Sequence, residues 1–378
     1  MKKILLAPDS FKGTLSAIQI CDILTQQIRQ VFDDVQVVSL PAADGGEGTA
    51  DCLRAARGGQ IKQVQTTGPF SEPITACYTL LEDGTAVVEL AAAAGFAQAA
   101  HRKDPAAATT YGVGALLRAA AADPQRKGQP ILVGLGGSCT NDFGCGLAAA
   151  CGVKFLDING KTFVPTGATL NRIAQIDISE LDPHLAQAPL IAMTDVTSPL
   201  FGPDGAAFVF APQKGADEAM VQQLDEGLRH VSQIVQRDLG QSVAQLPGAG
   251  AAGGAGGGLA AMFGARLQSG IATVLQALQF EQQLTDADLV ITGEGRMDRQ
   301  SVSGKVLSGV AAAAVRAKVP VIAIVGGYDG LQIAEQLGLT AVFSINTLPQ
   351  PLQISAPHAA QNLAATAANI FRLIRARL

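Results

Sequence analysis

Five short apolar segments, each bounded by turn residues, constrain the fold of this chain most. They lie at residues 3–7, 35–40, 289–292, 319–325 and 340–345. Helical patterns lie between or after them, at residues 16–31, 304–317, 330–337 and 359–377. Short apolar segments that alternate with helices are typical of buried parallel strands, because a parallel connection needs a long crossover. The chain is therefore predicted to be an α/β protein built on a parallel sheet.

The order of these strands follows from the handedness of the crossovers. Two of the segments precede residue 41 and three follow residue 288. If all five share one sheet, right-handed crossovers predict a doubly wound order such as 2-1-3-4-5, which is the flavodoxin-like arrangement. An open α/β sheet of this kind binds ligands at its switch point, here between the first and third strands.

The long segment between the second and third strands has a different pattern. The stretch "ITACYTLLEDGTAVVEL" (74–90) predicts a hairpin that turns at Asp83 and Gly84. A helix is expected at 111–122, buried strands at 130–137 and 189–196, and a further helix at 259–267. Such a mixture of strand directions is typical of a second α/β domain.

The predicted organisation is therefore one domain inserted into another. A flavodoxin-like domain is expected from residues 1–66 and 286–378, and the inserted α/β domain from residues 67–285. The active site is expected in the cleft between them. Two sequential domains divided near residues 155–185 are the alternative.

Composition excludes several classes of protein. Apolar residues make up 48% and charged residues 16%, with a net charge of −5, so the chain is neither disordered nor strongly basic. We expect no nucleic-acid or membrane partner. The six cysteines include no C-x-x-C pair, which argues against zinc. "MKKILLAPDS" is too short for a signal peptide, so a soluble cytoplasmic protein is predicted.

Acids, lysines and glycines gather just after the predicted strands. In the first domain, the residues of interest are Asp9, Ser10, Lys12, Asp44, Glu47, Gly293, Glu294, Arg296, Asp298 and Lys305. In the insert, they are Gly136, Gly137, Ser138, Asn141, Asp195 and Lys214. The carboxyl ends of parallel strands meet at one edge of a sheet, so we expect many of these side chains to converge there.

This combination favours phosphoryl transfer. Glycine lets backbone N–H groups approach an anion, lysines neutralise phosphates, and carboxylates hold the Mg²⁺ that bridges phosphate oxygens. The P-loop motif does not account for this combination. In "RQSVSGKV" (299–306), Arg299 stands where a P-loop has its first glycine, and Val306 stands where it has a serine or threonine. Each single residue also has a structural alternative, since acids occur in caps and turns and lysines on surfaces.

A glycine-rich stretch, "PGAGAAGGAGGG" (247–258), contains G-x-G-x-x-G at Gly248, Gly250 and Gly253. No apolar strand precedes it and no acid lies about 20 residues further on, so the match to a dinucleotide site is weak. A loop that faces a nucleotide and close packing of backbone are both open interpretations.

Together these segments resemble a known family. "APDSFKGTLSA", "ADGGEGT", "GLGGSCTND", "TDVTSPL", "PQKGA", "PGAGAAGG" and "ITGEGRMDRQSVSGK" are similar to the signature blocks of the type I glycerate kinase family, in family order. The resemblance implies ATP-dependent phosphorylation of D-glycerate to 2-phosphoglycerate by two α/β domains around a cleft. Phe143, in "TNDFGCG", departs from the glycine expected there and puts the roles of Asn141 and Asp142 in doubt.

The hypothesis gives each residue type a role. Asp195 and Glu294 would coordinate Mg²⁺, and either Asp44 or Asp298 would be the general base. Lys12, Lys214 and Lys305 would offset phosphoryl charge or hold the substrate carboxylate, assisted by Arg296. The remaining positions would bind glycerate or ATP: Asp9, Ser10, Glu47, Gly136, Gly137, Ser138, Asn141, Gly250, Gly253 and Gly293.

Other functions remain open at this point. A kinase of another small hydroxy acid and a non-catalytic sugar-acid-binding protein both fit two domains around a cleft. A flavodoxin-like electron carrier fits the strand order, but the chain has no Trp and only three Tyr to enclose a flavin. For the assembly, a homodimer is one expectation.

Overall fold

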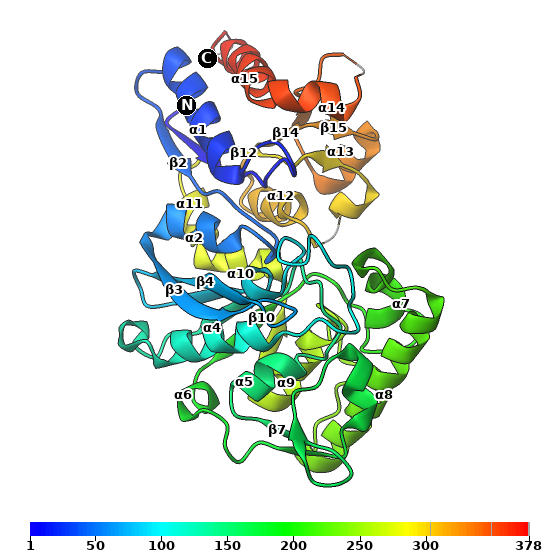
Figure 1. The fold of residues 1–378 in the computed structure, drawn as a ribbon. Helices are drawn as coiled ribbons and strands as arrows, with labels where there is room; N and C mark the ends of the chain where they lie inside the picture. Colours follow the sequence, from blue (N-terminus) through cyan, green and yellow to red (C-terminus); the bar gives the residue numbers. More distant parts are fainter. Residues whose placement is uncertain (303, 349, 377–378) are drawn as a thin grey trace. The chain divides into compact units, whose positions relative to one another are not determined.

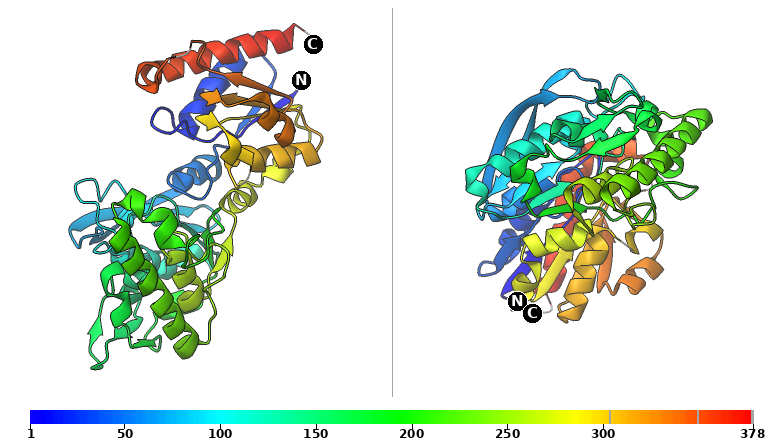
Figure 2. Two further views of the ribbon diagram at one scale, coloured as in Figure 1. Left: turned by 90° about the vertical axis from the view of Figure 1, so that its right-hand side faces the viewer. Right: turned by 90° about the horizontal axis from the view of Figure 1, so that it is seen from below.

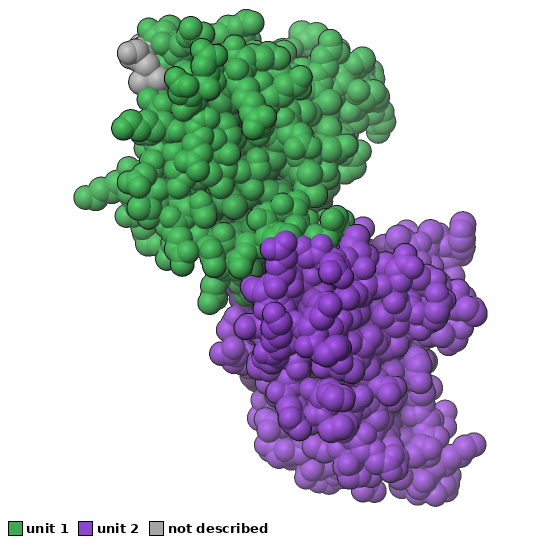
Figure 3. Space-filling model, turned by 90° about the vertical axis from the view of Figure 1, so that its left-hand side faces the viewer, with its two compact units in different colours: residues 1–44, 51–58, 270–378 green, residues 45–50, 59–269 purple. Residues whose placement is uncertain are grey.

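The computed structural model describes residues 1–302, 304–348 and 350–376 (Figure 1). The chain forms two compact units, shown in different colours in Figure 3. Unit 1 comprises residues 1–44, 51–58 and 270–378, and unit 2 comprises residues 45–50 and 59–269. The boundaries proposed from the sequence differ from these at residues 45–50, 59–66 and 270–285.

A five-stranded parallel sheet forms the centre of unit 1. Its order is β16-β14-β12-β1-β2, which is 2-1-3-4-5 when the five strands are numbered along the chain. The strands are β1 (Lys3–Leu6), β2 (Gln36–Ser39), β12 (Leu289–Thr292), β14 (Val321–Val325) and β16 (Ala341–Ser344). The prediction of an α/β chain with a parallel sheet is confirmed.

Helices cover both faces of this sheet because its central strands are apolar on both sides. Along β14, Ile322 and Ile324 join one core cluster, and Ala323 and Val325 join another. Helices α1 (Ala17–Val31) and α15 (Ala359–Arg375) pack together in the first cluster (Figure 2). Helices α12 (Val306–Arg316) and α13 (Leu331–Leu337) supply the second. Side chains that alternate along a strand thus hold one layer of helices on each face.

The other elements of unit 1 are short. Strands β13 (Arg296–Met297) and β15 (Gly327–Tyr328) pair in parallel just beyond the carboxyl edge of the main sheet. The remaining helices are α2 (Thr49–Arg57), α10 (Gly270–Ala277), α11 (Phe280–Leu284) and α14 (Leu352–Ser355).

Unit 2 contains a mixed six-stranded sheet in the order β11-β10-β6-β5-β4-β3. Its antiparallel part consists of β3 (Gly59–Thr67), β4 (Pro73–Leu81) and β5 (Ala86–Glu89). The parallel part adds β6 (Ile131–Gly134), β10 (Leu190–Met193) and β11 (Arg266–Gln268). The hairpin predicted at 74–90 is therefore present as β4 and β5. Because β3 pairs with β4 along its whole length, residues 59–66 belong to this sheet.

Helices and a second small sheet complete unit 2. Its helices are α3 (Ala91–Ala94), α4 (Tyr111–Ala122), α5 (Cys145–Ala150), α6 (Pro183–Ala186), α7 (Ala206–Phe210), α8 (Glu218–Leu239) and α9 (Ala255–Phe263). The small sheet has the order β8-β7-β9, from β7 (Lys154–Leu156), β8 (Thr162–Phe163) and β9 (Gln175–Asp177). Two apolar cores result, one under the large sheet with α4 and one around α8.

One predicted helix is partly wrong. The sequence suggested a helix at 259–267, but α9 begins at Ala255 and ends at Phe263. Gly264 follows with φ of +63°, a left-handed conformation that terminates helices, and the next residues form β11. The three glycines at 256–258 are unfavourable in a helix, because glycine destabilises a helix interior.

Close packing explains why α9 begins with glycines. A Cβ on Gly258 would lie 1.9 Å from the carbonyl oxygen of Phe143, and one on Gly256 would lie 2.5 Å from the oxygen of Gly248. A Cβ on Gly257 would lie 3.1 Å from the edge of the Phe143 ring and 3.3 Å from both the Cβ and the carbonyl oxygen of Ala249, so its contacts are longer. The glycines therefore lower the intrinsic stability of the helix, but they allow it to pack directly against the backbone of neighbouring segments.

No helix in the described part of the chain is long and apolar enough to cross a membrane.

The packing of α9 leads to a graded prediction. Gly258→Ala should lower the free energy of unfolding by roughly 1–3 kcal/mol, because its methyl group overlaps backbone that cannot move freely. Gly257→Ala, in the same helix, should be much milder, since its closest contacts are 3.1 Å or longer and alanine favours the helix. Thermal unfolding followed by circular dichroism measures both, and equal effects at the two positions would contradict this explanation.

Candidate functional site

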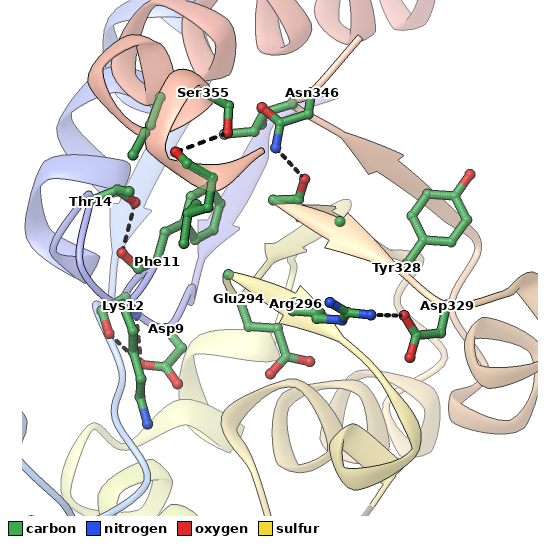
Figure 4. A pocket seen from close by; sticks show the side chains of 18 of the residues that line it. Asp9, Phe11, Lys12, Thr14, Glu294, Arg296, Tyr328, Asp329, Asn346 and Ser355 are labelled. Carbon is green, nitrogen blue, oxygen red and sulfur yellow. Dashed lines mark hydrogen bonds and ion pairs between the residues drawn. The ribbon is translucent and has the colours of Figure 1, made fainter. Parts of the chain in front are cut away.

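Unit 1 contains a pocket of about 830 Å³ at the carboxyl edge of its parallel sheet (Figure 4). The loops after β1, β2, β12, β14 and β16 all contribute to it. Seven of the residues predicted from the sequence line it: Asp9, Ser10, Lys12, Asp44, Glu294, Arg296 and Lys305. The parallel register of the strands brings these separate segments together.

Backbone contacts hold the first and third loops against each other. The N–H of Asp9 donates to the carbonyl of Gly293 at 2.9 Å, and the side chain of Asp9 accepts from the N–H of Ser10 at 2.6 Å. A Cβ on Gly293 would lie 2.0 Å from the oxygen of Ile324. Gly293 is thus required for close approach to β14, and it positions the Glu294 that follows.

Carboxylates crowd the floor of the pocket. Burial and the nearby Asp44 raise the pKa of Asp9 from 3.8 to about 6, although hydrogen bonds from Ser10 and the charge of Lys12 act in the opposite direction. Burial also raises the pKa of Glu294, with further contributions from Asp9 and Asp298. The Oε1 atom of Glu294 is buried and has no hydrogen-bond partner. The floor therefore holds negative charge that the protein itself only partly neutralises.

The cations around the pocket differ in their partners. Lys305 Nζ lies 4.0 Å from Glu294 Oε2 and 3.9 Å from Asp298 Oδ1. Arg296 is exposed and forms an ion pair with Asp329 at 2.8 Å. Lys12 is exposed at the pocket edge. Lys305 thus lies near both Glu294 and Asp298, whereas Lys12 is exposed to solvent.

Only one of the two predicted bases lines the pocket. Asp298 accepts from the N–H of Gln300 at 2.8 Å at the start of a 3₁₀ turn, Arg299–Val302, and is not among the lining residues. Asp44 follows β2 and does line the pocket. The geometry therefore favours Asp44 over Asp298 for contact with a substrate.

The far side of the pocket was missed by the sequence reasoning. Asn346 donates to the carbonyl of Gly326 at 2.7 Å, which connects the loops after β16 and β14. An apolar wall stands beside it, formed by Phe11, Ile345, Leu352, Ala356 and Ala359. Asn346 directly follows the fifth predicted strand, so the rule that sites lie at strand ends could have found it. The apolar wall depends on α14 and α15 and had no local signal.

Unit 2 brings together the predicted residues that follow β6 and β10. A Cβ on Gly136 would lie 2.6 Å from the Cα of Gly46, and one on Gly137 would lie 3.9 Å from Glu47 Oε2. Glu47 is exposed beside this turn. Asp195 follows β10 and accepts from the hydroxyl of Ser269 at 2.7 Å. These side chains thus share the carboxyl edge of the parallel part of the sheet.

A buried lysine lies next to this turn. Lys214, 3% exposed, donates to Ser138 Oγ at 2.9 Å and to the carbonyl of Thr140 at 2.6 Å. Burial lowers the pKa of Lys214 to about 8, although Cys139 and Asp142 act in the opposite direction. Asn141 is fully buried, and neither amide atom has a partner.

The neighbouring residues are structural. Asp142 is fully buried and accepts from the N–H and the hydroxyl of Thr110, both at 2.8 Å, and from two further backbone N–H groups. Phe143 is also fully buried, within the core around α8, with φ of +58°. Its ring therefore fills a core and does not narrow a loop at the surface.

Gly250 and Gly253 take part in close packing. A Cβ on Gly250 would lie 2.3 Å from the oxygen of Pro199, and one on Gly253 would lie 2.2 Å from the oxygen of Thr140. Both are buried. The packing interpretation of the glycine-rich stretch thus accounts for both, and Gly253 supports the loop that carries Asn141.

Comparison with known proteins gives these two clusters a context. The model of the glycerate kinase family matches residues 4–375. The chain is 44% identical to glycerate 2-kinase of Escherichia coli (strain K12), over 91% of each chain. It is 42% identical to glycerate kinase of Bacillus subtilis (strain 168), over 99% of this chain and 98% of that one. The chain belongs to the glycerate kinase family.

A solved structure agrees with this assignment. A Salmonella typhimurium LT2 protein, provisionally named glycerate kinase 2, superposes with a TM-score of 0.89 at 41% identity, over 99% of this chain and 98% of that one. The chain is therefore a kinase, a phosphotransferase with an alcohol acceptor, as the sequence predicted. Membership in a kinase family implies the use of ATP.

The acids of the pocket fit Mg²⁺ by donor chemistry. No three Asp, Glu, His or Cys side chains in the described ranges are arranged as a metal cage. Mg²⁺ does not need one, because it usually takes one or two carboxylates and completes its shell with water and phosphate oxygens. The unpartnered Oε1 of Glu294, next to Asp9, is a suitable oxygen for this purpose.

The crowded carboxylates make a prediction about stability. Asp9 has a pKa of about 6 in the folded protein, against the ordinary aspartate value of 3.8, so its ionisation favours unfolding as the pH rises through this interval. Asp9→Asn should therefore increase the free energy of unfolding at pH 8, by at most about 3 kcal/mol. At pH 4, where Asp9 is protonated in the folded state and about half protonated in the unfolded state, the gain should fall below about 1 kcal/mol.

Differential scanning calorimetry at pH 4 and pH 8 measures this difference. Asp22→Asn, on the exposed side of α1, is the matched control and should show no such gain. A loss of stability in Asp9→Asn at pH 8 would contradict the electrostatic account.

Proposed function

We propose that this chain catalyses the ATP-dependent phosphorylation of D-glycerate, with Mg²⁺, to give 2-phospho-D-glycerate. The observation that carries this proposal is the floor of the unit 1 pocket in a member of the glycerate kinase family. Buried carboxylates with raised pKa values stand there beside Lys12 and Lys305. A site in which lysines stand beside acids whose charge is only partly neutralised suits a metal-bound polyphosphate.

The pocket has space and lining for a nucleoside triphosphate. Its volume, about 830 Å³, falls within the usual range for sites of small molecules and cofactors. The apolar wall at Ile345, Leu352 and Ala359 would receive the base, and the charged floor would receive the phosphates. A ligand that is apolar at one end and anionic at the other matches this division.

Glu294 and Asp9 would hold the metal ion in this pocket. Bound Mg²⁺ would neutralise phosphate charge and relieve the repulsion that raises both pKa values. Asp195, the other ligand predicted from the sequence, lies in unit 2, and its contribution remains a prediction.

The remaining side chains would position the reactants. Lys12 and Lys305 would stabilise charge on the transferred phosphoryl group, since phosphoryl transfer depends mainly on positioning and electrostatics. Asp44 would accept the proton of the attacking hydroxyl, which is too weak an acid to ionise by itself. Ser10 and the Gly136–Ser138 turn would add hydrogen bonds.

We infer that unit 1 is a flavodoxin-like domain and that unit 2 is inserted into it. The strand order of unit 1 supports the first part of this inference.

The identity of the product tests the proposal directly. With ATP, Mg²⁺ and D-glycerate, phosphorus NMR should show ADP together with the doublet of a phosphate on a secondary carbon. A triplet from a phosphate on the terminal carbon would identify 3-phosphoglycerate and contradict the assigned position. Binding of glycerate without ADP formation would favour a sugar-acid-binding protein.

The proposed cations make a second prediction. Lys12→Ala should lower kcat/KM by roughly 10²–10³-fold, because a charge that stabilises the transition state is lost. Lys2→Ala, an exposed lysine in the same unit, should leave it unchanged. An unchanged kcat/KM in Lys12→Ala would make Lys12 a surface residue.

The two predicted metal ligands can be separated by the dependence on magnesium. Glu294→Gln should raise the Mg²⁺ concentration that gives half-maximal activity by at least about 10-fold, since it removes one charged oxygen ligand. Asp195→Asn is expected to cut turnover by orders of magnitude if this residue also binds the ion. Near-normal turnover of Asp195→Asn at saturating Mg²⁺ would remove it from the metal site.

A further inference from the structure

Unit 2 buries a cation without a counter-ion. Lys214 is 3% exposed, and among the described residues no carboxylate lies within ion-pair distance of its Nζ. Its two hydrogen bonds go to neutral oxygens, Ser138 Oγ and the carbonyl of Thr140. The ammonium group has three N–H donors, so one is left over. Burying a charge in this way is costly unless something else compensates it.

The residues beside this lysine are also unsatisfied. Both Oδ1 and Nδ2 of Asn141 are buried without a hydrogen-bond partner, and so is the hydroxyl of Thr140. Asn141 and Thr140 are both fully buried. A buried polar group without a partner costs about 1–3 kcal/mol. Three such atoms in two consecutive residues therefore lower the free energy of unfolding. The neighbouring Asp142, by contrast, is fully satisfied.

We propose that Lys214, Asn141 and Thr140 form the site in unit 2 that binds the hydroxy acid through its carboxylate and the hydroxyl that is not phosphorylated. This assignment rests on the proposed function, and it deepens it by separating the acid's site from the nucleotide pocket of unit 1. The spare N–H of Lys214 and the Nδ2 of Asn141 are donors for a carboxylate. The Oδ1 of Asn141 is an acceptor and needs a ligand that can donate.

This last requirement distinguishes a hydroxy acid from a phosphate. A nucleotide's phosphate oxygens only accept hydrogen bonds, so they would leave Oδ1 of Asn141 unpaired. A single lysine also provides too little charge for a triphosphate, whereas it matches one carboxylate. The 3-hydroxyl of glycerate, which is not the attacking group, supplies the missing donor. The set of unsatisfied atoms therefore matches a carboxylate together with a second hydroxyl, and it leaves the 2-hydroxyl free for phosphoryl transfer.

The glycine turn beside the cluster reaches the surface of unit 2. Ser138 is buried, but Gly137 next to it is exposed, with φ of +74°. Glu47 is exposed beside this turn. Its negative charge would repel anions that do not also bind the buried Lys214.

Binding of D-glycerate alone, without ATP, tests the assignment. Isothermal titration should give about 10- to 100-fold weaker binding of D-glycerate for Lys214→Met and for Asn141→Leu, because charged and neutral hydrogen bonds to the ligand are lost. Binding of a non-hydrolysable ATP analogue with Mg²⁺ should remain within about 2-fold. Lys161→Met and Asn159→Leu, both at exposed positions of unit 2, are the matched controls and should change neither affinity.

Thermal unfolding separates a binding role from a structural one. Asn141→Leu keeps the size of the side chain and removes two unpartnered atoms, so its midpoint should equal or exceed that of the wild type. A purely structural asparagine would instead give a lower midpoint together with unchanged glycerate affinity. That result would overturn the proposal.

Ligand analogues identify which group each residue holds. Glycerol lacks the carboxylate of D-glycerate. Replacing D-glycerate with glycerol should therefore weaken binding to the wild type far more than it weakens binding to Lys214→Met. Removing the 3-hydroxyl, in D-lactate, should likewise matter less in Asn141→Leu than in the wild type. Equal losses in variant and wild type would overturn the proposed pairings, as would a variant that loses affinity for the ATP analogue and not for glycerate.

The proposed function can fail without this inference failing. If the protein binds D-glycerate with the dependence on Lys214 and Asn141 described here but forms no ADP, then the site is supported and the kinase assignment for glycerate is not. If it phosphorylates D-glycerate while both variants bind the acid normally, the kinase assignment holds and this site is wrong.

Discussion

Repulsion among buried carboxylates is the constraint on which the unit 1 pocket depends. Asp9 and Glu294 follow adjacent parallel strands, so the register of β1 and β12 places their side chains close together. Burial is the main cost of ionising either acid; Asp44 adds to that cost for Asp9, and Asp9 and Asp298 add to it for Glu294. The fold can maintain this arrangement because the sheet, with helices on both faces, is rigid enough to oppose the repulsion. A bound cation would be attracted by the same carboxylate charges that repel one another in its absence.

Both units hold polar groups that the protein leaves unsatisfied, and both hold them in place by close packing of glycine. In unit 1, Gly293 lies against β14 and directs Glu294 into the pocket. In unit 2, Gly253 lies against the loop that carries Asn141. Such positions accept no larger side chain, so the loops have little freedom to turn their polar groups elsewhere. Preorganisation of this kind reduces the cost of binding.

The rule that sites lie at the carboxyl ends of parallel strands was enough to predict the charged residues that the first three strands contribute to the unit 1 pocket. Asp9, Asp44 and Glu294 each follow an apolar segment whose pattern is visible in the sequence. Asp298 shows the limit of that rule, since its side chain turns back to the start of a 3₁₀ turn. The helix α9 shows another limit, because its glycines are favoured only by their contact with Phe143. Neither effect has a signature within a window of neighbouring residues.

The sequence by itself determined the alternation of strands and helices, the parallel sheet of unit 1 and the residue types that its edge would carry. It could do so because hydrophobic periodicity and turn residues are local properties. Only the tertiary structure decided that Lys214 is buried without a counter-ion, that both amide atoms of Asn141 lack partners, and that Asp142 is structural. Burial and hydrogen-bond satisfaction depend on segments that are distant in the chain, so the same residue types can be surface charges, core supports or ligands until their neighbours are known.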